Sequence, residues 1–169
     1  MSDDHDILQQ IQSNTIETLH LSESYDRYVK TPQEFADAMN ANTSIRSVIF
    51  DGDFLGATVA KERAVIVSCL GNLPHLETVT LADSLVMMGV CMTNLVKNSP
   101  SVTTLTLKQC VLQGIPSDFD LFTAALETNT TLKEIRLIQC TVPNDEVQFD
   151  TVVDGIQSGG NIAIDVSSS

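Results

Sequence analysis

Histidine and cysteine side chains are the first candidates for chemistry in this sequence. The three histidines are His5, His20 and His75, and the four cysteines are Cys69, Cys91, Cys110 and Cys140. No two histidines are separated by about one helical turn, the spacing that directs two rings at one metal ion. The cysteines form no CxxC pair. We therefore expect no metal site and no cofactor.

Cys110 and Cys140 each stand at the end of an alternating apolar segment. Such a pair is compatible with a redox function or with half of a metal site. Their equivalent positions in a repeating pattern favour another interpretation, in which each small thiol is buried and its S–H reaches a backbone carbonyl. We expect both thiols, together with Cys69 and Cys91, to be core residues.

The acidic segment Asp51-Gly52-Asp53 is a further candidate for cation binding. It lacks the additional carboxylates that a calcium loop supplies, so we expect Asp53 to serve a turn. The sequence has no phosphate-binding loop, no nucleophilic serine flanked by glycines and no GxGxxG motif after a strand. We therefore expect no enzymatic activity.

Composition and charge narrow the classes of partner. The 169 residues fit one domain, and a hydrophobic content of 43% with 18% charged residues is typical of an ordered chain. A formal net charge of -13 repels phosphate backbones and anionic lipid surfaces, so we expect neither nucleic acid nor a membrane as partner. The acidic first residues differ from a secretory signal, which favours a soluble, cytoplasmic protein.

Five segments of the sequence repeat one apolar pattern. They begin at Ile16, Ile45, Leu76, Val102 and Leu132, which lie 29, 31, 26 and 30 residues apart. In each segment the first, fourth and sixth residues are apolar, and the ninth is a small polar or thiol residue. The alternation around Leu105 and Leu107 predicts a short strand with one buried face. Such strands bury enough surface only when several units stack in parallel.

The segments between these strands have a helical pattern. Apolar residues stand ten and six positions before each following unit, and the pairs are Phe35 and Met39, Ile66 and Leu70, Met92 and Val96, Phe122 and Leu126, and Val152 and Ile156. A separation of four residues places both members on one helix face, which predicts amphipathic helices behind the sheet. The same frame places Ile162 at the start of a sixth strand.

Local residues suggest where elements begin and end. Thr31 followed by Pro32 and Glu34 predicts a capped helix start, and Ser117 with Asp120 suggests a weaker one. Asp26 stands where the other units have an apolar residue, so we expect the first turn to deviate. We predict a capping helix within residues 1–13 that covers the first strand, a repeat domain over residues 14–166 and a disordered tail over residues 167–169.

The segment Val102-Thr-Thr-Leu105-Thr-Leu107-Lys-Gln-Cys110 resembles the leucine-rich repeat, with cysteine at the asparagine position of that pattern. The resemblance covers about residues 14 to 166. It implies an α/β solenoid, with a curved parallel sheet on the concave face, helices on the convex face, five repeats and a terminal strand. The length of the repeats is similar to the ribonuclease-inhibitor-like class. Ser24, Asp53 and Ser84 depart from the pattern, although each can still bond to a turn backbone.

The unit end Leu126-Glu-Thr-Asn129-Thr-Thr-Leu132 has a second, weaker likeness to the repeat domains of tropomodulin and leiomodin, which are actin-capping proteins. These resemblances imply a protein-binding role without catalysis. None of the functional residues of the actin-capping family is carried over, because the chain shows no basic tail and no amphipathic leading helix of that family.

Outward positions on the predicted strands are the first candidate binding surface. They form columns on the concave face, of which one contains His20, Ile49, Thr80, Thr106 and Arg136 and a second contains Thr18, Ser47, Thr78, Thr104 and Glu134. The residues that stand out are His20, Ile49, Asp51, Lys108, Arg136 and Ile138. Ile49 and Ile138 are apolar residues expected to face solvent, and Lys108 with Arg136 predicts a local basic patch.

The last predicted strand offers a second surface, because no later segment of the sequence covers its free edge. Its candidate residues are Ile162, Ile164 and Val166. An open edge can pair with a protein partner or with a second copy, or it can be the point where a further repeat followed.

We therefore expect a non-enzymatic protein-interaction module or scaffold subunit that binds a protein through the concave face or the open edge. The alternatives are a regulator of an enzyme, such as an inhibitor or a helper of GTP hydrolysis, and an actin-filament capping protein.

Overall fold

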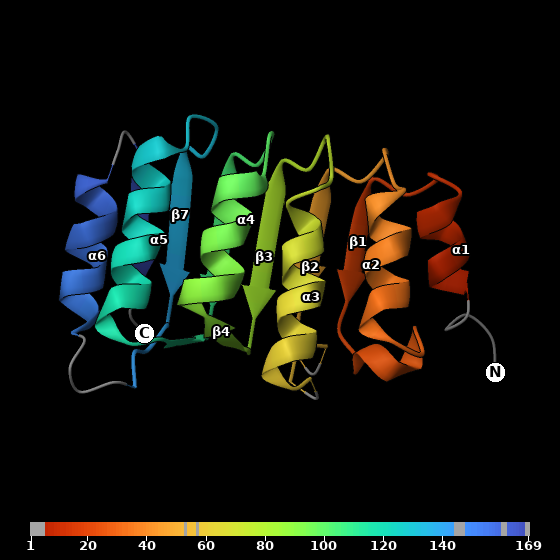
Figure 1. Ribbon diagram of the computed structural model, residues 1–169, viewed down its shortest axis with the longest axis horizontal. Coiled ribbons are helices and arrows are strands. Elements are labelled where there is room, and N and C mark those ends of the chain that lie inside the picture. Colours follow the sequence, from red (N-terminus) through yellow and green to blue (C-terminus); the bar gives the residue numbers. More distant parts are fainter. Residues whose placement is uncertain (1–5, 53, 57, 144–147, 160–161, 168–169) are drawn as a thin grey trace.

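The computed structural model describes residues 6–52, 54–56, 58–143, 148–159 and 162–167. Figure 1 shows the helices as a row in front of the strands. The helices are α1 (Asp6–Gln12), α2 (Pro32–Asn40), α3 (Ala60–Leu70), α4 (Thr93–Asn98), α5 (Pro116–Thr128) and α6 (Phe149–Ser158), with a 3-10 turn η1 (Tyr25–Arg27) and a π-helical segment η2 (Met88–Met92). The strands are β1 (Thr18–Leu21), β2 (Ser47–Phe50), β3 (Thr78–Ala82), β4 (Leu85–Met87), β5 (Thr104–Lys108), β6 (Val111–Gln113), β7 (Glu134–Ile138) and β8 (Ala163–Ser167).

The fold is mixed α/β, and its main sheet has six parallel strands in the order β1-β2-β3-β5-β7-β8. The predicted register is confirmed for the first five strands, whose inward residues form one continuous column of Leu19, Val48, Val79, Leu105 and Ile135. On β8 this column continues at Ile164, one residue before the position that a sixth unit beginning at Ile162 predicts. The five side chains from Leu19 to Ile135 are at most 1% exposed. The strands follow chain order because each crossover helix returns the chain to the next position at the edge.

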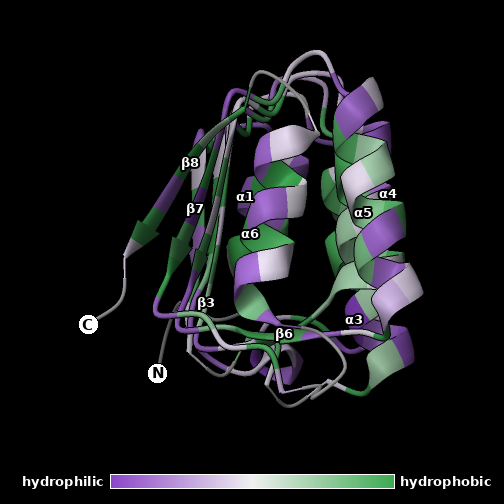
Figure 2. Ribbon diagram, turned by 90° about the vertical axis from the view of Figure 1, so that its left-hand side faces the viewer, coloured by the Kyte–Doolittle hydropathy of each residue, from purple (hydrophilic) through white to green (hydrophobic). Residues whose placement is uncertain are grey.

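One hydrophobic core lies between the sheet and the helices. The ten residues predicted to form the inner helix faces are all buried, with at most 6% exposure. Phe35 on α2 contacts Phe50 and Phe54 with ring centroids 6.0 and 5.6 Å apart. In Figure 2, α1 and α6 lie closer to the sheet than α3 to α5 do, so the helix layer bulges outward and the free face of the sheet is concave.

A second, two-stranded parallel sheet of β4 and β6, which the repeat pattern does not predict, closes one end of this core. The chain turns from the main strands at residues with left-handed backbone geometry, which are Gly52, Asp83, Gln109 and Gln139, with φ between 49° and 55°. Gln109 donates its N–H to the Ile138 carbonyl at 2.6 Å. The turns therefore connect neighbouring units as well as redirecting the chain.

Several predicted boundaries differ from the structure. The leading helix α1 begins at Asp6 and stands beside α2 in the helix row (Figure 1), and its Ile11 is buried in the core that also contains Leu19 of β1. The start of α5 is capped by Asp118, which accepts the Ile115 N–H at 3.0 Å, because Pro116 places the first turn earlier than Ser117. Ser167, assigned above to a disordered tail, is the last residue of β8 and bonds to Gln139.

Two of the predicted boundaries are confirmed. At α2 the Thr31 hydroxyl accepts the Glu34 N–H at 3.2 Å, as the cap pattern predicted. The first turn deviates as expected at Asp26, where the chain forms η1. Asp53, assigned above to a turn, and residues 1–5 of the predicted capping segment lie outside the described residues.

Candidate interaction surfaces

The free face of the main sheet is covered by no described helix or strand (Figure 2). Its columns follow the predicted register, with His20, Ile49, Thr80, Thr106 and Arg136 side by side on successive strands. His20 and Arg136 at its ends are exposed, while the three residues between them are half-buried. Small hydroxyl side chains fill the middle of the neighbouring column, where Thr78 Oγ1 and Ser47 Oγ are 2.8 Å apart.

The first end of this face carries His20, Ile49 and Asp51. The Nε2 atom of His20 lies 3.8 Å from Oδ2 of Asp51, and both side chains are about half exposed (53% and 42%). Asp51 also accepts the Gly52 N–H at 2.7 Å, which fixes the carboxylate at the end of β2. Ile49 lies beside them, half-buried. The sequence prediction therefore identified residues that the register brings together.

The other end of the face carries Lys108, Arg136 and Ile138, and here the predicted basic patch is wrong. Both Nε and Nη2 of Arg136 bond to the Glu134 carboxylate at 2.9 Å, and Asp165 is its register partner on β8. Hydrogen bonding to Glu134 raises the pKa of Arg136 above its ordinary value. Lys108 remains exposed and Ile138 is half-buried. Two carboxylates therefore offset the positive charge of Arg136.

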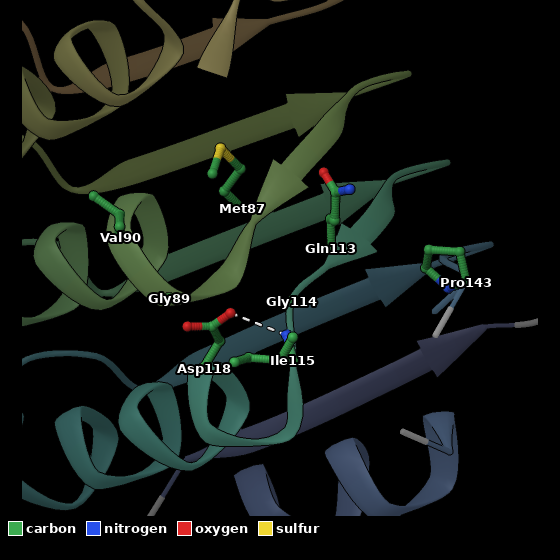
Figure 3. Close-up of a pocket in the computed structure, with 8 residues that line it drawn as sticks. All are labelled: Met87, Gly89, Val90, Gln113, Gly114, Ile115, Asp118 and Pro143. Atoms are coloured by element: carbon green, nitrogen blue, oxygen red, sulfur yellow. Dashed lines mark hydrogen bonds between the residues drawn. The ribbon is translucent and has the colours of Figure 1, made fainter. Parts of the chain in front are cut away.

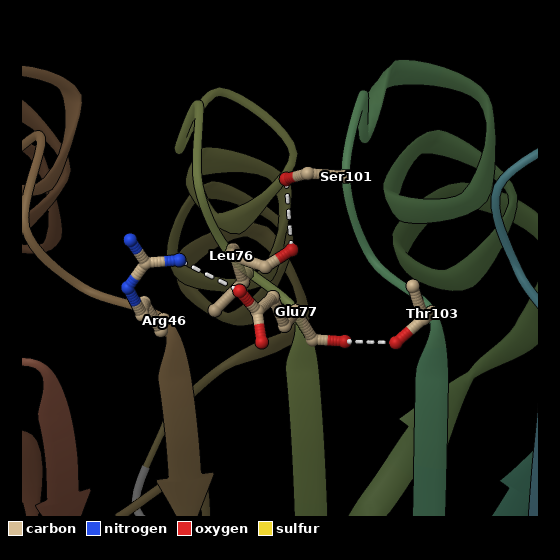
Figure 4. Close-up of polar contacts among 5 residues, drawn as sticks. All are labelled: Arg46, Leu76, Glu77, Ser101 and Thr103. Atoms are coloured by element: carbon tan, nitrogen blue, oxygen red, sulfur yellow. Dashed lines mark hydrogen bonds and ion pairs between the residues drawn. The ribbon is translucent and has the colours of Figure 1, made fainter.

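A row of polar contacts joins neighbouring units where their strands begin (Figure 4). Arg46 Nη1 bonds to Glu77 Oε1 at 2.7 Å across β2 and β3. The hydroxyls of Ser101 and Thr103 donate to the carbonyls of Leu76 and Glu77 at 2.8 and 3.2 Å. These contacts hold neighbouring units in register, and Glu77 offsets the positive charge of Arg46. We therefore interpret this row of contacts as structural and do not include it among the candidate binding surfaces.

The edge strand β8 pairs with β7 and is the last strand of the described sheet. Of its three predicted binding residues, Ile162 precedes the strand and is only 9% exposed, because it packs into the core. Ile164 is half-buried against the core, and Val166 is 42% exposed. The edge therefore offers Val166 and backbone groups, whereas Ile162 is a core residue.

A groove beside the small sheet was missed in the sequence analysis (Figure 3). It encloses about 540 Å³ and is lined by Met87, Gly89, Val90, Gln113, Gly114, Ile115, Asp118 and Pro143. Val90 and Ile115 are exposed by 53% and 60%. A Cβ atom at Gly89 would collide with the Asp118 carboxylate, and one at Gly114 would also contact Asp118. The glycines at these two positions were the sequence signal that a side chain packs closely there.

The prediction that the thiols are buried is confirmed for Cys69, Cys91 and Cys110 and is wrong for Cys140. Cys110 Sγ lies 3.2 Å from the Leu81 carbonyl oxygen, and Cys140 Sγ lies 3.2 Å from that of Leu107. Burial raises the pKa of Cys69 to about 12. The neighbouring thiol of Cys110 lowers the pKa of Cys140 to about 7, and the neighbouring thiol of Cys140, together with burial, raises the pKa of Cys110. Cys140 is half-buried, in contrast to the other three.

No group of three or more histidine, cysteine or acidic side chains with metal-binding geometry occurs within the described ranges. Across the same ranges no helix combines the length and the apolar character needed to cross a bilayer. The cation-binding candidate at residues 51–53 is described only at Asp51 and Gly52.

The geometry of parallel strands, crossover helices and one free sheet face defines a class of fold, and solved structures share it. No protein-family model and no curated protein sequence matches this chain. Its fold is similar to a structure described as leiomodin-1 actin-binding site 2, with a TM-score of 0.64 and 12% identity over 94% of this chain and 88% of that one. It is also similar to the tropomodulin C-terminal domain of Caenorhabditis elegans, with a TM-score of 0.52 and 12% identity over 99% and 84% of the two chains.

Proposed function

We propose that this chain is a non-enzymatic, cytoplasmic protein-binding module and that actin is its partner. The observation that carries the proposal is the similarity in fold to leiomodin-1 actin-binding site 2, which spans nearly the whole of both chains. The junction around Asn129 was the sequence feature that resembled the same proteins. At 12% identity the fold is shared while the side chains are not, so the contacts must be argued from this chain.

The free sheet face is the proposed contact surface, and the exposed edge of β8 extends it. The face is the one large surface of the main sheet that the described helices leave open, and its ends carry the exposed side chains His20, Lys108 and Arg136. We also propose that the units form five leucine-rich repeats of the ribonuclease-inhibitor-like type. Such stacks present a continuous concave surface to a protein partner.

Cosedimentation with actin filaments, together with the rate of filament elongation, tests this proposal. The full chain is expected to pellet with filaments or to change the elongation rate. The absence of both effects would contradict the proposal of actin as partner, and capture of a different protein by the same face would then support a scaffold. Acceleration of GTP hydrolysis by a small GTPase would favour the enzyme-regulator alternative.

Two substitutions locate the contact. Arg136→Glu places a third carboxylate beside Glu134 and Asp165, and we expect it to weaken binding by about tenfold or more if the face is used. Val166→Pro removes a backbone N–H from the free edge of β8. This N–H points away from β7, because the Ala163 N–H faces β7 and the direction alternates from one residue to the next. Lys61→Glu on the helix layer reverses the same kind of charge away from the sheet and should leave binding unchanged.

A further inference from the structure

Cys110 and Cys140 lie next to each other on neighbouring turns of the molecule. Each follows a strand of the main sheet, and Thr141 donates its N–H to the Cys110 carbonyl at 3.0 Å. The bridge between Val111 and Thr141 continues this parallel pairing by one residue. Neighbouring strands are separated by about 4.8 Å. This separation lies within the range of about 4.4–6.8 Å between the Cα atoms of disulfide-bonded residues.

The side chains point in the same direction as well. The sulfur atoms of Cys110 and Cys140 each lie 3.2 Å from the carbonyl of a residue on the preceding strand, and those residues, Leu81 and Leu107, are direct register partners. The register of these two carbonyls therefore places the two sulfur atoms side by side on neighbouring turns. The preceding unit has Ser84 at this position, so the described ladder contains one thiol pair.

The two cysteines differ in access. Cys110 is 1% exposed, whereas Cys140 is half-buried and reaches solvent. The neighbouring Cys110 lowers the pKa of Cys140, which favours the thiolate, and the thiolate is the nucleophilic form of cysteine. An oxidant from solvent therefore meets Cys140 first, and Cys110 lies on the neighbouring turn.

From this geometry we propose that Cys140 and Cys110 form an oxidant-sensitive site, at which a peroxide oxidises Cys140 and Cys110 then closes a disulfide. The proposal does not depend on the proposed partner. In the first step the Cys140 thiolate sulfur attacks one oxygen of hydrogen peroxide, the O–O bond breaks, hydroxide leaves and Cys140 becomes a sulfenic acid.

In the second step the Cys110 sulfur attacks the Cys140 sulfur, so that an S–S bond forms and the S–O bond breaks. The departing hydroxide takes the Cys110 proton and leaves as water. In total, two thiols and one hydrogen peroxide give one disulfide and two waters. The sulfur atoms supply the two electrons that reduce the peroxide.

Peptide mapping of the full chain tests the site. The folded protein is treated with hydrogen peroxide, blocked with N-ethylmaleimide after denaturation and digested with trypsin without reductant. Cleavage after Lys108, Lys133 and Arg136 separates Cys110, in residues 109–133, from Cys140, in residues 137–169. We expect these two peptides to be joined, and free thiols to fall from the four of the sequence by two per chain. Dithiothreitol should reverse the change.

The peptide of residues 64–97 holds Cys69 and Cys91 and is the internal control, because both are buried and should remain alkylated. In Cys110→Ser, Cys140 should be oxidised without a cross-link. In Cys140→Ser, Cys110 should stay reduced. Circular dichroism establishes that each variant is folded. If a variant does not fold, the peptide map of the wild-type chain still tests the proposal. Oxidation of wild-type Cys140 to sulfinic acid with Cys110 still reduced, or no oxidation of either thiol, would overturn the proposal.

Discussion

Two asparagines hold equivalent corners where a helix passes into the next strand. Asn129 donates from Nδ2 to the Val96 carbonyl at 2.8 Å, and its Oδ1 accepts the N–H groups of Thr131 and Leu132 at 2.9 and 2.7 Å. Asn42 makes the same three contacts at an earlier corner, to Ile11 and to the backbone that follows it. One side chain thus links two units and shapes a turn.

The Asn129 corner gives a prediction at the residue scale. Asn129→Ala leaves one carbonyl and two N–H groups without their partner, so the free energy of unfolding should fall by about 2–3 kcal/mol. Chemical denaturation followed by circular dichroism measures this change. The matched control is Thr130→Ala, whose exposed side chain should matter by less than about 0.5 kcal/mol. Equal effects of the two substitutions would refute the role of the corner.

At the scale of elements, the left-handed turns after the main strands carry backbone strain. Gln109 has φ of 53°, in a region where a side chain costs roughly 1–2 kcal/mol, yet its N–H bonds to the Ile138 carbonyl. Only Gly52 among the four equivalent residues avoids this cost. The turn is kept because it directs the chain from β5 into β6, and β6 closes the end of the core.

Substitutions at Gln109, compared with the same substitutions at Gln113, test the backbone strain of this turn. Gln109→Gly should leave the free energy of unfolding unchanged or raise it by up to about 1 kcal/mol, whereas Gln109→Val should lower it by about 1–3 kcal/mol. Gln113 on β6 is the control, since an exposed strand residue should lose about 0.5–1 kcal/mol on change to glycine and tolerate valine. The same ranking at both positions would contradict the argument from φ.

At the scale of the whole molecule, the net charge of -13 acts against folding by self-repulsion. The described ion pairs are mostly on exposed side chains, so each contributes little to stability. The stack of buried columns therefore supplies most of the stability, and charge sets its dependence on salt.

Added salt should consequently stabilise the folded chain. Raising sodium chloride from about 20 mM to about 200 mM shortens the screening length several-fold, and we expect the melting temperature to rise by a few degrees. Sodium sulfate at equal ionic strength should give a similar rise if screening is the cause. A rise in sulfate alone would indicate exclusion of the salt from apolar surface instead of charge screening.

The sequence by itself determined the main strands, the helices behind them and the register of the first five strands. Apolar residues at every second position of a strand, and four positions apart in a helix, are local patterns. They predict which face of each strand and helix is buried. Because units of similar length stack in parallel, Leu105 and Ile135 could be placed in one column before any coordinates. The residues of the free face, including His20 and Ile49, followed from the same alternation.

Only the tertiary structure decided what each surface residue does. The carboxylates of Glu134 and Asp165 offset the positive charge of Arg136, and Ile162 is buried in the core. Residues of β4 and β6 line a groove beside the small sheet. Contacts of this kind depend on the distance between strands and on turn geometry, which no local period encodes. For the same reason the chemistry of Cys110 and Cys140 became visible only once their turns lay side by side.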